Sequence, residues 1–314
     1  FGRIVGQIRA VDGVSFELNE GECLGLVGES GSGKTTLGRT ILRALTPTSG
    51  RVLFRTDEGM VDLAQVSQKT LKGLRHHLQM IFQDPYASLN PRMTVLDIVG
   101  EPLLVNGMTN RIDREGRVRE LLEQVGLKPH FLRRYPHAFS GGQRQRIGIA
   151  RALALQPRLI VADEPVSSLD VSVQSQVLNL LHELQLKFRL TTLFIAHDLS
   201  VVRHISDRVA VMYGGQLVEL ADVDRLFNMP GHPYSEALLS SVLVPQRQRK
   251  TKPIFLSGEV ADPGNLPTGC IFHPRCRYAE SRCREEVPQF LEIEPEHFVR
   301  CHLGKDLSLV GLED

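Results

Sequence analysis

Residues 28–35 decide the fold: Gly28-Glu29-Ser30-Gly31-Ser32-Gly33-Lys34-Thr35 fits the pattern G-x-x-x-x-G-K-[ST]. The short apolar run before it, residues 22–27, predicts a buried strand, and residues 34–45 after it predict a helix. A chance glycine-rich turn has no reason to sit between a strand and a helix. This context therefore favours a loop that binds phosphate groups.

The residue types of this loop suit a nucleotide. Glycines let successive backbone N–H groups point inward around phosphates, and the start of a helix adds partial positive charge. We expect Lys34 to reach the β- and γ-phosphates and the Thr35 hydroxyl to coordinate Mg²⁺. Thr36 completes the predicted nucleotide-binding stretch.

The rest of the chain predicts an α/β domain. Strands are expected at residues 158–162, 192–196 and 208–212, and a long helix at residues 171–188. Strands that alternate with helices favour a mostly parallel sheet. Three further helices, at residues 94–105, 113–125 and 142–155, predict a helical insertion in that domain.

Composition narrows the function. The chain has 314 residues and a net charge of +1, so no global basic character points to nucleic acid or to an acidic membrane surface. It has no run of 18 apolar residues that would span a bilayer by itself. Because the chain begins at Phe1 rather than Met, we expect the natural N-terminus to lie upstream.

A second motif carries acidic chemistry. The apolar run at residues 158–162 leads directly into Asp163 and Glu164, at the end of a strand where α/β sheets bind ligands. Asp163 is expected to hold Mg²⁺, directly or through water, and Glu164 to polarise the attacking water as general base. By itself, such an Asp-Glu pair is more often part of a solvated loop. The phosphate loop earlier in the chain favours the metal-binding and catalytic roles instead.

A third motif indicates the family. Phe139-Ser140-Gly141-Gly142-Gln143-Arg144-Gln145-Arg146 resembles the signature motif of ATP-binding cassette (ABC) proteins, with Phe139 where the common form has Leu. Its alternative reading is a Ser N-cap followed by glycines. The resemblance implies that this helix start, with Ser140, Gly141, Gly142 and Gln143, faces the γ-phosphate bound by the opposite subunit.

Smaller motifs follow the same order as in ABC proteins. Gln83 matches the Q-loop glutamine, Asp170 in Ser168-Leu169-Asp170 matches the D-loop, and His197 matches the switch histidine. The resemblance covers about residues 8–228 and implies a P-loop NTPase (RecA-like) fold with MgATP between two cassettes. It implies catalytic roles for Glu164, His197 and Gln83, with Gln83 also near Mg²⁺. The aromatic residue that stacks on adenine is not evident, and we expect it upstream of the sequence.

Three stretches narrow the resemblance to dipeptide and oligopeptide permease ATPases: residues 84–92 (DPYASLNPR), 10–16 (AVDGVSF) and 231–239 (GHPYSEALL). The resemblance implies an importer subunit at the cytoplasmic face of the bacterial inner membrane. Its implied partners are a second, non-identical ATPase, two transmembrane permease subunits and, indirectly, an extracytoplasmic peptide-binding protein, with no nucleic acid. Import of nickel complexes or glutathione, or a soluble regulatory or repair ATPase, remain alternatives.

These motifs predict three parts. The RecA-like core comprises residues 1–83 and 155–230, the helical subdomain residues 84–154, and a C-terminal permease-type extension residues 231–314. Four prolines in residues 244–269 predict a linker inside the extension.

The extension concentrates cysteines. Cys270, Cys276, Cys283 and Cys301 have the spacing C-x5-C-x6-C-x17-C, whereas Cys23 stands alone and is expected to be a small buried residue. Four thiolates suit a [4Fe–4S] cluster or zinc, and metal-free thiols or disulfides are the alternative. The family resemblance implies the [4Fe–4S] cluster, in a structural or regulatory role. His273 and His302 are candidate zinc ligands or surface residues, and nothing in the sequence places the cysteines near the phosphates.

Overall fold

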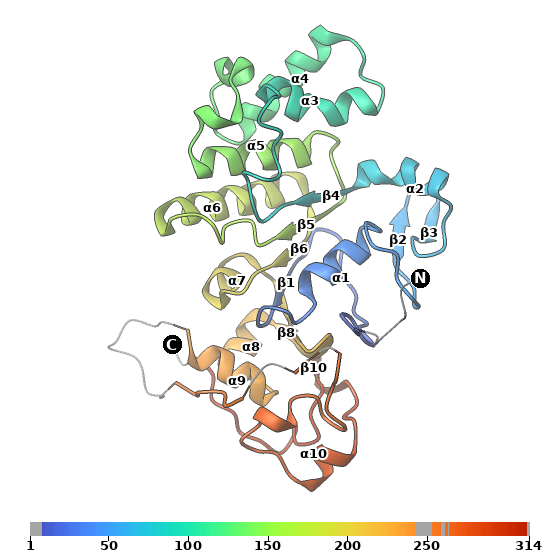
Figure 1. Cartoon of the computed structure of the whole chain (residues 1–314), viewed down its shortest axis with the longest axis vertical. Coiled ribbons are helices and arrows are strands. Elements are labelled where there is room, and N and C mark those ends of the chain that lie inside the picture. Colours follow the sequence, from blue (N-terminus) through green and yellow to red (C-terminus); the bar gives the residue numbers. More distant parts are fainter. Residues whose placement is uncertain (1–7, 243–252, 259–260, 263, 313–314) are drawn as a thin grey trace, which may run out of the picture. The chain divides into compact units, whose positions relative to one another are not determined.

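The computed structural model describes residues 8–242, 253–258, 261–262 and 264–312 (Figure 1). Its contacts divide the chain into two compact units. Unit 1 comprises Phe1–Leu18, Cys23–Leu37 and Ala196–Asp314, and unit 2 comprises Asn19–Glu22 and Gly38–Ile195. The division passes through helix α1 (Lys34–Ile41).

Unit 1 contains a five-strand arrangement in the order β1-β7-β8-β10-β9. Its strands are β1 (Cys23–Val27), β7 (Arg208–Tyr213), β8 (Gln216–Asp222), β10 (His297–Val299) and β9 (Leu291–Glu294). β1 pairs with β7 in parallel, and the other neighbours are antiparallel. Gly214 and Gly215 connect β7 to β8 with φ of 52° and 84°, the left-handed conformation that a tight hairpin turn requires.

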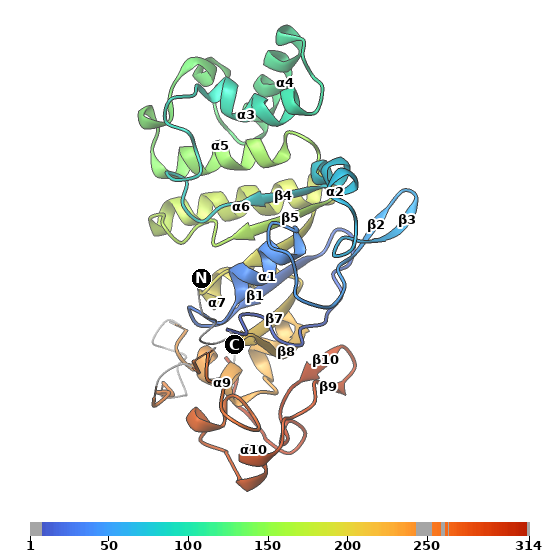
Figure 2. The same cartoon turned by 45° about the vertical axis from the view of Figure 1, so that its right-hand side comes forward.

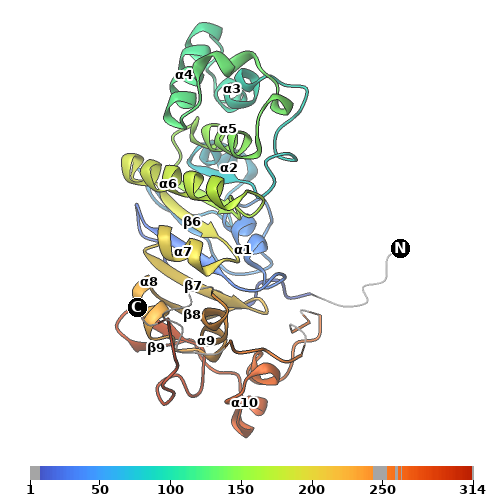
Figure 3. The same ribbon diagram turned by 90° about the vertical axis from the view of Figure 1, so that its left-hand side faces the viewer.

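Short helices complete unit 1. They are α7 (Leu199–Ile205), α8 (Val223–Asn228), α9 (Pro233–Ser240), the 3₁₀ turn η4 (His273–Arg275) and α10 (Ser281–Glu285). Figure 3 shows α8 and α9 beside the β7–β8 hairpin. The rings of Tyr213 on β7 and Tyr234 on α9 lie 4.8 Å apart, and Phe272 packs on both, so the extension and the hairpin share one buried aromatic core.

Unit 2 contains a parallel sheet and a small hairpin. The sheet has the order β4 (Leu78–Ile81), β5 (Leu159–Asp163) and β6 (Thr191–Ile195), and the hairpin joins β2 (Leu53–Thr56) to β3 (Gly59–Asp62). Every residue of β5 is buried, as its continuous apolar sequence predicts for a central parallel strand. Helices α2 (Gln68–Leu74), α6 (Val171–Phe188) and the 3₁₀ turn η1 (Arg75–His77) belong to the same unit.

Between β4 and β5 the chain of unit 2 is helical (Figure 2). It forms α3 (Val95–Val105), α4 (Arg111–Gln124), η2 (Pro129–Arg133), η3 (Pro136–Ala138) and α5 (Gly141–Leu153). Ile98 of α3 and Val118 and Leu122 of α4 are at most 2% exposed and form part of the core of this helical region. Residues 84–154, all of them described, hold no strand, as the sequence pattern predicts; the subdomain boundaries themselves stay a prediction.

The predicted elements agree with the structure except at some ends. Residues 171–188 form α6 as predicted, but the helix predicted to reach residue 45 ends at Ile41. Arg43 there adopts φ 53° while its Nε donates a 2.7 Å hydrogen bond to the Leu63 carbonyl, and this left-handed residue ends the helix. No helix among the described residues is long and apolar enough to cross a membrane.

Candidate functional site: a phosphate loop held by the C-terminal extension

The phosphate loop joins β1 to α1 in a conformation that only glycine allows at three positions. Gly28, Gly31 and Gly33 have φ of 149°, 79° and 101°. A Cβ atom on Gly28 would lie 2.1 Å from the Met212 carbonyl oxygen, and one on Gly33 would lie 2.1 Å from that of Ala10. The glycine pattern read from the sequence therefore reflects both backbone conformation and close packing.

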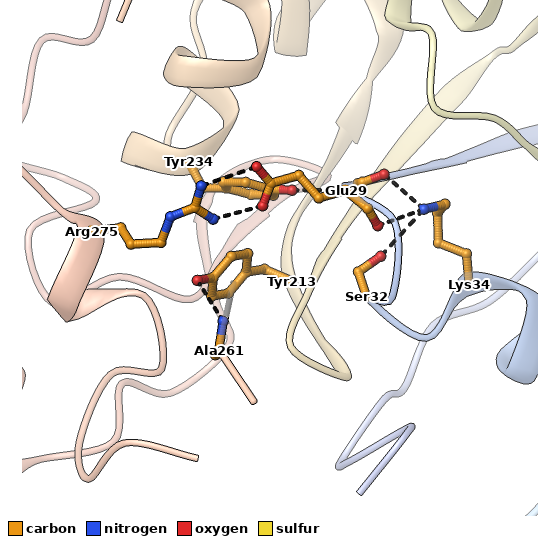
Figure 4. Close-up of polar contacts among 8 residues, drawn as sticks. Glu29, Ser32, Lys34, Tyr213, Tyr234, Ala261 and Arg275 are labelled. Carbon is orange, nitrogen blue, oxygen red and sulfur yellow. Dashed lines mark hydrogen bonds and ion pairs between the residues drawn. The ribbon is translucent and has the colours of Figure 1, made fainter. Parts of the chain in front are cut away.

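Lys34 lies over this loop (Figure 4). Its Nζ donates hydrogen bonds to the carbonyls of Gly28 at 2.7 Å and Glu29 at 2.8 Å, and to Ser32 Oγ at 3.4 Å. The side chain is 5% exposed, so the ammonium is held at the loop rather than in solvent. Thr35 follows in the first turn of α1, half-buried. This arrangement places a fixed positive charge where the sequence motif predicts phosphate binding.

Glu29, inside the loop, is held by two residues of the C-terminal extension. Its backbone N–H donates a 2.8 Å hydrogen bond to the Tyr234 hydroxyl. Its carboxylate accepts two bonds from Arg275, at 2.6 and 3.1 Å, in a bidentate pair (Figure 4). Burial raises the pKa of the Tyr234 hydroxyl, and the Glu29 carboxylate raises the pKa of Arg275, so one stays neutral and the other charged.

Unit 2 brings the predicted general base and the Q-loop residue together. Glu164 follows Asp163 at the end of β5, and Gln83 Nε2 donates a 3.1 Å hydrogen bond to Glu164 Oε2. Glu164 has φ 45°, and its N–H donates to the Ile195 carbonyl at 3.0 Å. A non-glycine residue in the left-handed region that is fixed by its neighbours is typical of functional sites. Asp163 is 3% exposed, buried at the root of this turn.

The signature motif forms the start of α5. Ser140 is its N-cap: Ser140 Oγ accepts from the Gln143 N–H at 3.4 Å, and Gln143 Oε1 accepts from the Ser140 N–H at 3.1 Å. The N-cap reading and the signature reading are therefore compatible. A Cβ on Gly142 would lie 2.3 Å from Val173 Cγ1, so that glycine is required by packing against α6. Gly141 beside it is half-buried.

Two predicted residues lie at the starts of other helices. Asp170 is the N-cap of α6, and its exposed side chain makes no capping hydrogen bond. His197 is exposed and directly precedes Asp198, the N-cap of α7. The predicted residues thus divide between the units. Unit 1 holds the phosphate loop with Ser30 and Thr36, and His197; unit 2 holds Gln83, Asp163, Glu164, the signature residues and Asp170. Phe1 lies outside the described residues.

The four clustered cysteines line one small cavity. The cavity is lined by Cys270, Cys276, Cys283 and Cys301 together with His232, His273 and His302. Both histidines named from the sequence as candidate zinc ligands, His273 and His302, therefore lie at the same cavity as the cysteines. The cavity holds about 10 Å³, room for about one water molecule. Cys23 is fully buried elsewhere in unit 1, as predicted.

The cavity does not form a finished metal centre. Burial raises the pKa of the Cys276 thiol to about 11 and that of Cys301 to about 12, which favours neutral thiols over the thiolates that bind metal. Within the described ranges, no three His, Cys, Asp or Glu side chains lie close enough to share a metal ion. The donor set fits a four-thiolate group, but the cavity must widen and the thiols must lose protons to hold it.

Sequence reasoning missed the residues that fix the loop from outside. Arg275 lies 246 residues from Glu29 in the sequence. Its segment was interpreted only through the clustered cysteines and the histidines beside them, so Arg275 was not named as a functional residue. Tyr234 lies in residues 231–239, whose sequence indicated only the permease resemblance, and no local pattern indicated a contact with the loop. The sequence placed no part of the cysteine segment near the phosphate loop, whereas in the structure Arg275, which directly precedes Cys276, bonds Glu29 of that loop.

Comparison with known proteins agrees with this geometry. Residues 11–167 match the family profile described as ABC transporter, and residues 218–283 match that of the oligopeptide/dipeptide transporter C-terminal region. The oligopeptide transport ATP-binding protein AppF of Bacillus subtilis is 56% identical over 306 residues, 96% of this chain and 92% of AppF. A putative peptide import ATP-binding protein of Brucella ovis is 50% identical over 294 residues, covering 94% of this chain and 92% of that protein.

Solved structures show the same cassette. CbiO1 of Clostridium perfringens, part of the ABC transporter complex cbiONQ, is 30% identical with a TM-score of 0.62, over 69% of this chain and 84% of that one. A dimeric bacterial ABC transporter cassette, MJ0796, is 30% identical with a TM-score of 0.61, over 68% and 90%. The chain belongs to the ABC transporter family and, by its C-terminal region, to the oligopeptide/dipeptide branch of its ATP-binding subunits.

Proposed function

We propose that the chain is the ATP-hydrolysing subunit of an importer for di- or oligopeptides. The observation that carries the proposal is the joint presence of an ABC cassette and the oligopeptide/dipeptide C-terminal region in one chain. Relatives matched over more than nine-tenths of this chain are named as oligopeptide transport or peptide import ATP-binding proteins. The phosphate loop and its buried lysine support the ATP-binding part.

The site divides its work among the predicted residues. Lys34 and the loop N–H groups bind the phosphates, while Thr35, Gln83 and Asp163 would hold Mg²⁺, which would neutralise charge on the phosphates. Glu164 takes the proton of the attacking water, and His197 contacts the γ-phosphate. The start of α5 and Asp170 complete the site of a second cassette, so that hydrolysis separates the pair. The Gln83–Glu164 hydrogen bond supports a shared role of these two side chains.

The importer requires further subunits. We infer two transmembrane permease subunits, a second and non-identical ATPase, and an extracytoplasmic peptide-binding protein that acts indirectly. The chain would then work as a peripheral protein at the cytoplasmic face of a bacterial inner membrane. The relatives named for peptide import support this assembly.

The four cysteines of the extension are proposed to hold a [4Fe–4S] cluster in a structural or regulatory role. Their convergence on one cavity supports a shared ligand, and four thiolates are the ordinary ligand set of such a cluster. Iron and sulfide of about four each per chain after anaerobic purification would support it. A zinc content of about one, or no metal, would contradict it, and Cys270→Ser serves as the control that should lose the metal.

Transport is tested in cells that lack the chain. We expect uptake of a labelled tripeptide to be lost, restored by the unaltered chain and not by Glu164→Gln, which slows hydrolysis by about 10²–10⁴-fold. The tagged chain should co-purify from solubilised membranes with two integral membrane proteins. Recovery without membrane proteins would favour a regulatory ATPase, and restored uptake of nickel or glutathione but not peptide would change the substrate.

A further inference from the structure

The C-terminal extension contacts the phosphate loop at one residue, Glu29, and does so twice. Tyr234 of α9 accepts the Glu29 N–H, and Arg275 of η4 donates two hydrogen bonds to the Glu29 carboxylate. The Arg275 side chain is 7% exposed and the Glu29 side chain 27% exposed, so the ion pair is largely shielded from solvent. A shielded, bidentate pair holds its geometry far better than an exposed one.

The turn that carries Arg275 is itself fixed. The N–H of His273 donates to the Cys270 carbonyl at 3.0 Å, and the N–H of Cys276 donates to the His273 carbonyl at 3.2 Å. The guanidinium lies 5.9 Å from the centre of the buried Tyr213 ring. Arg275 therefore approaches Glu29 from a turn that its own backbone hydrogen bonds hold in shape.

Glu29 in turn holds the lysine that binds phosphate. Its carbonyl accepts the Lys34 Nζ bond at 2.8 Å and the Ser32 N–H bond at 3.2 Å. A displacement of Glu29 thus moves both the ammonium and one of the N–H groups that line the loop. The chain of contacts runs from Arg275 through Glu29 to Lys34, all within unit 1.

We propose that Arg275 is a positioning residue for ATP binding: it fixes Glu29, and through Glu29 it holds Lys34 and the phosphate loop ready for the phosphates. This inference rests on the proposed ATPase function. Because Arg275 acts on the phosphate loop of unit 1, whereas the predicted water-activating residues Gln83 and Glu164 belong to unit 2, its effect falls on nucleotide affinity and not on the chemical step.

The experiment measures ATP affinity and turnover of the full chain. For Arg275→Gln we expect the Kd of a fluorescent ATP analogue and the KM for ATP to rise about tenfold, equivalent to about 1.4 kcal/mol. The kcat at saturating ATP should stay within about twofold, because the water-activating groups are unchanged. Arg275→Lys, which keeps the charge but not the bidentate geometry, should recover part of the affinity.

Two comparisons separate positioning from a general loss of stability. Arg277→Gln is the matched control: it removes an ion pair with buried Glu236 in the same segment without a contact to the loop, and should leave Kd unchanged. The double variant Glu29→Gln/Arg275→Gln should bind ATP no more weakly than Glu29→Gln alone, because Arg275 acts through that carboxylate.

The outcomes are distinct. An unchanged Kd in Arg275→Gln, an equal loss in Arg277→Gln, or additive losses in the double variant would overturn the positioning role and leave the ATPase function intact. A rise in Kd with parallel loss of kcat and unfolding at assay temperature would also overturn it. Failure of the unaltered chain to bind the analogue would instead overturn the proposed function, and the positioning role with it.

Discussion

Removal of the carboxylate at Glu219 should release the start of the extension. Glu219 lies on β8 and is fully buried. Its Oε1 accepts the Gly231 N–H at 2.6 Å and lies 2.7 Å from His297 Nε2, and its Oε2 accepts the His232 N–H at 2.9 Å. One side chain thus fixes the segment that begins α9 and the strand β10 together.

The magnitude follows from the number of donors that lose their acceptor. In Glu219→Gln the amide oxygen takes the place of one carboxylate oxygen and can still accept a hydrogen bond. The NH₂ group takes the place of the other oxygen, where it meets a backbone N–H that is itself a donor. One buried N–H is left unpaired, which costs about 2 kcal/mol. Glu219→Ala leaves the N–H groups of Gly231 and His232 and the ring of His297 without their acceptor, and should cost about 4 kcal/mol.

Urea unfolding of the full chain and amide hydrogen exchange measure these losses. We expect Glu219→Gln to lower the free energy of unfolding by about 2 kcal/mol and to raise local exchange at Gly231 or His232 about 30-fold. Glu294→Gln, at an exposed ion pair with Arg225, is the control and should change stability by less than about 1 kcal/mol. A Glu219→Gln chain as stable as the unaltered one, with unchanged exchange, would refute this role of the carboxylate.

Two further predictions concern the loop and the extension. Gly33→Ala should weaken ATP binding at least about tenfold in a nucleotide titration, since its Cβ would lie 2.1 Å from the Ala10 carbonyl oxygen and the loop must distort; wild-type affinity would contradict the glycine argument. Burial lowers the pKa of His232 from 6.5 to about 3, so only the unfolded chain takes up this proton between those values. The contribution of the neutral His232 ring to the free energy of unfolding is fully present above pH 6.5, and it should fall by up to about 1.4 kcal/mol per pH unit below that value. His232→Gln should flatten this part of the pH profile, and an unchanged slope would exclude the ring as its source.

The sequence predicted the cassette because its signals are local. The glycines of residues 28–33 need left-handed or crowded backbone positions, and the apolar run before Asp163 and Glu164 needs a buried parallel strand. Each requirement leaves a pattern within about ten residues. The helix over residues 171–188 was predicted to its ends for the same reason. The roles of the individual site residues stay predictions until variants are measured.

Other features depend on partners far apart in the chain. β9 and β10 were not predicted, because these short segments lack a strong apolar alternation: β10 is held by pairing with β8 and by Glu219, and β9 by pairing with β10. The four cysteines were predicted as one group, and they line one cavity, but their buried thiols and the small volume do not form a metal centre by themselves. No spacing rule reports burial or cavity volume.

Two separate segments of the extension converge on the same loop residue, and their supports differ. Tyr234 depends on the start of α9, which Glu219 anchors, whereas Arg275 depends on η4, which the backbone around Cys270 and Cys276 fixes. A disturbance of the cysteine cavity can therefore reach Glu29 by two routes: through η4 and Arg275, and through His232, which also lines the cavity, and Tyr234. Because Lys34 Nζ also donates to the Gly28 carbonyl and to Ser32 Oγ, the loop would keep part of its hold on Lys34, which is the behaviour required of a segment that adjusts nucleotide affinity rather than one that switches binding off.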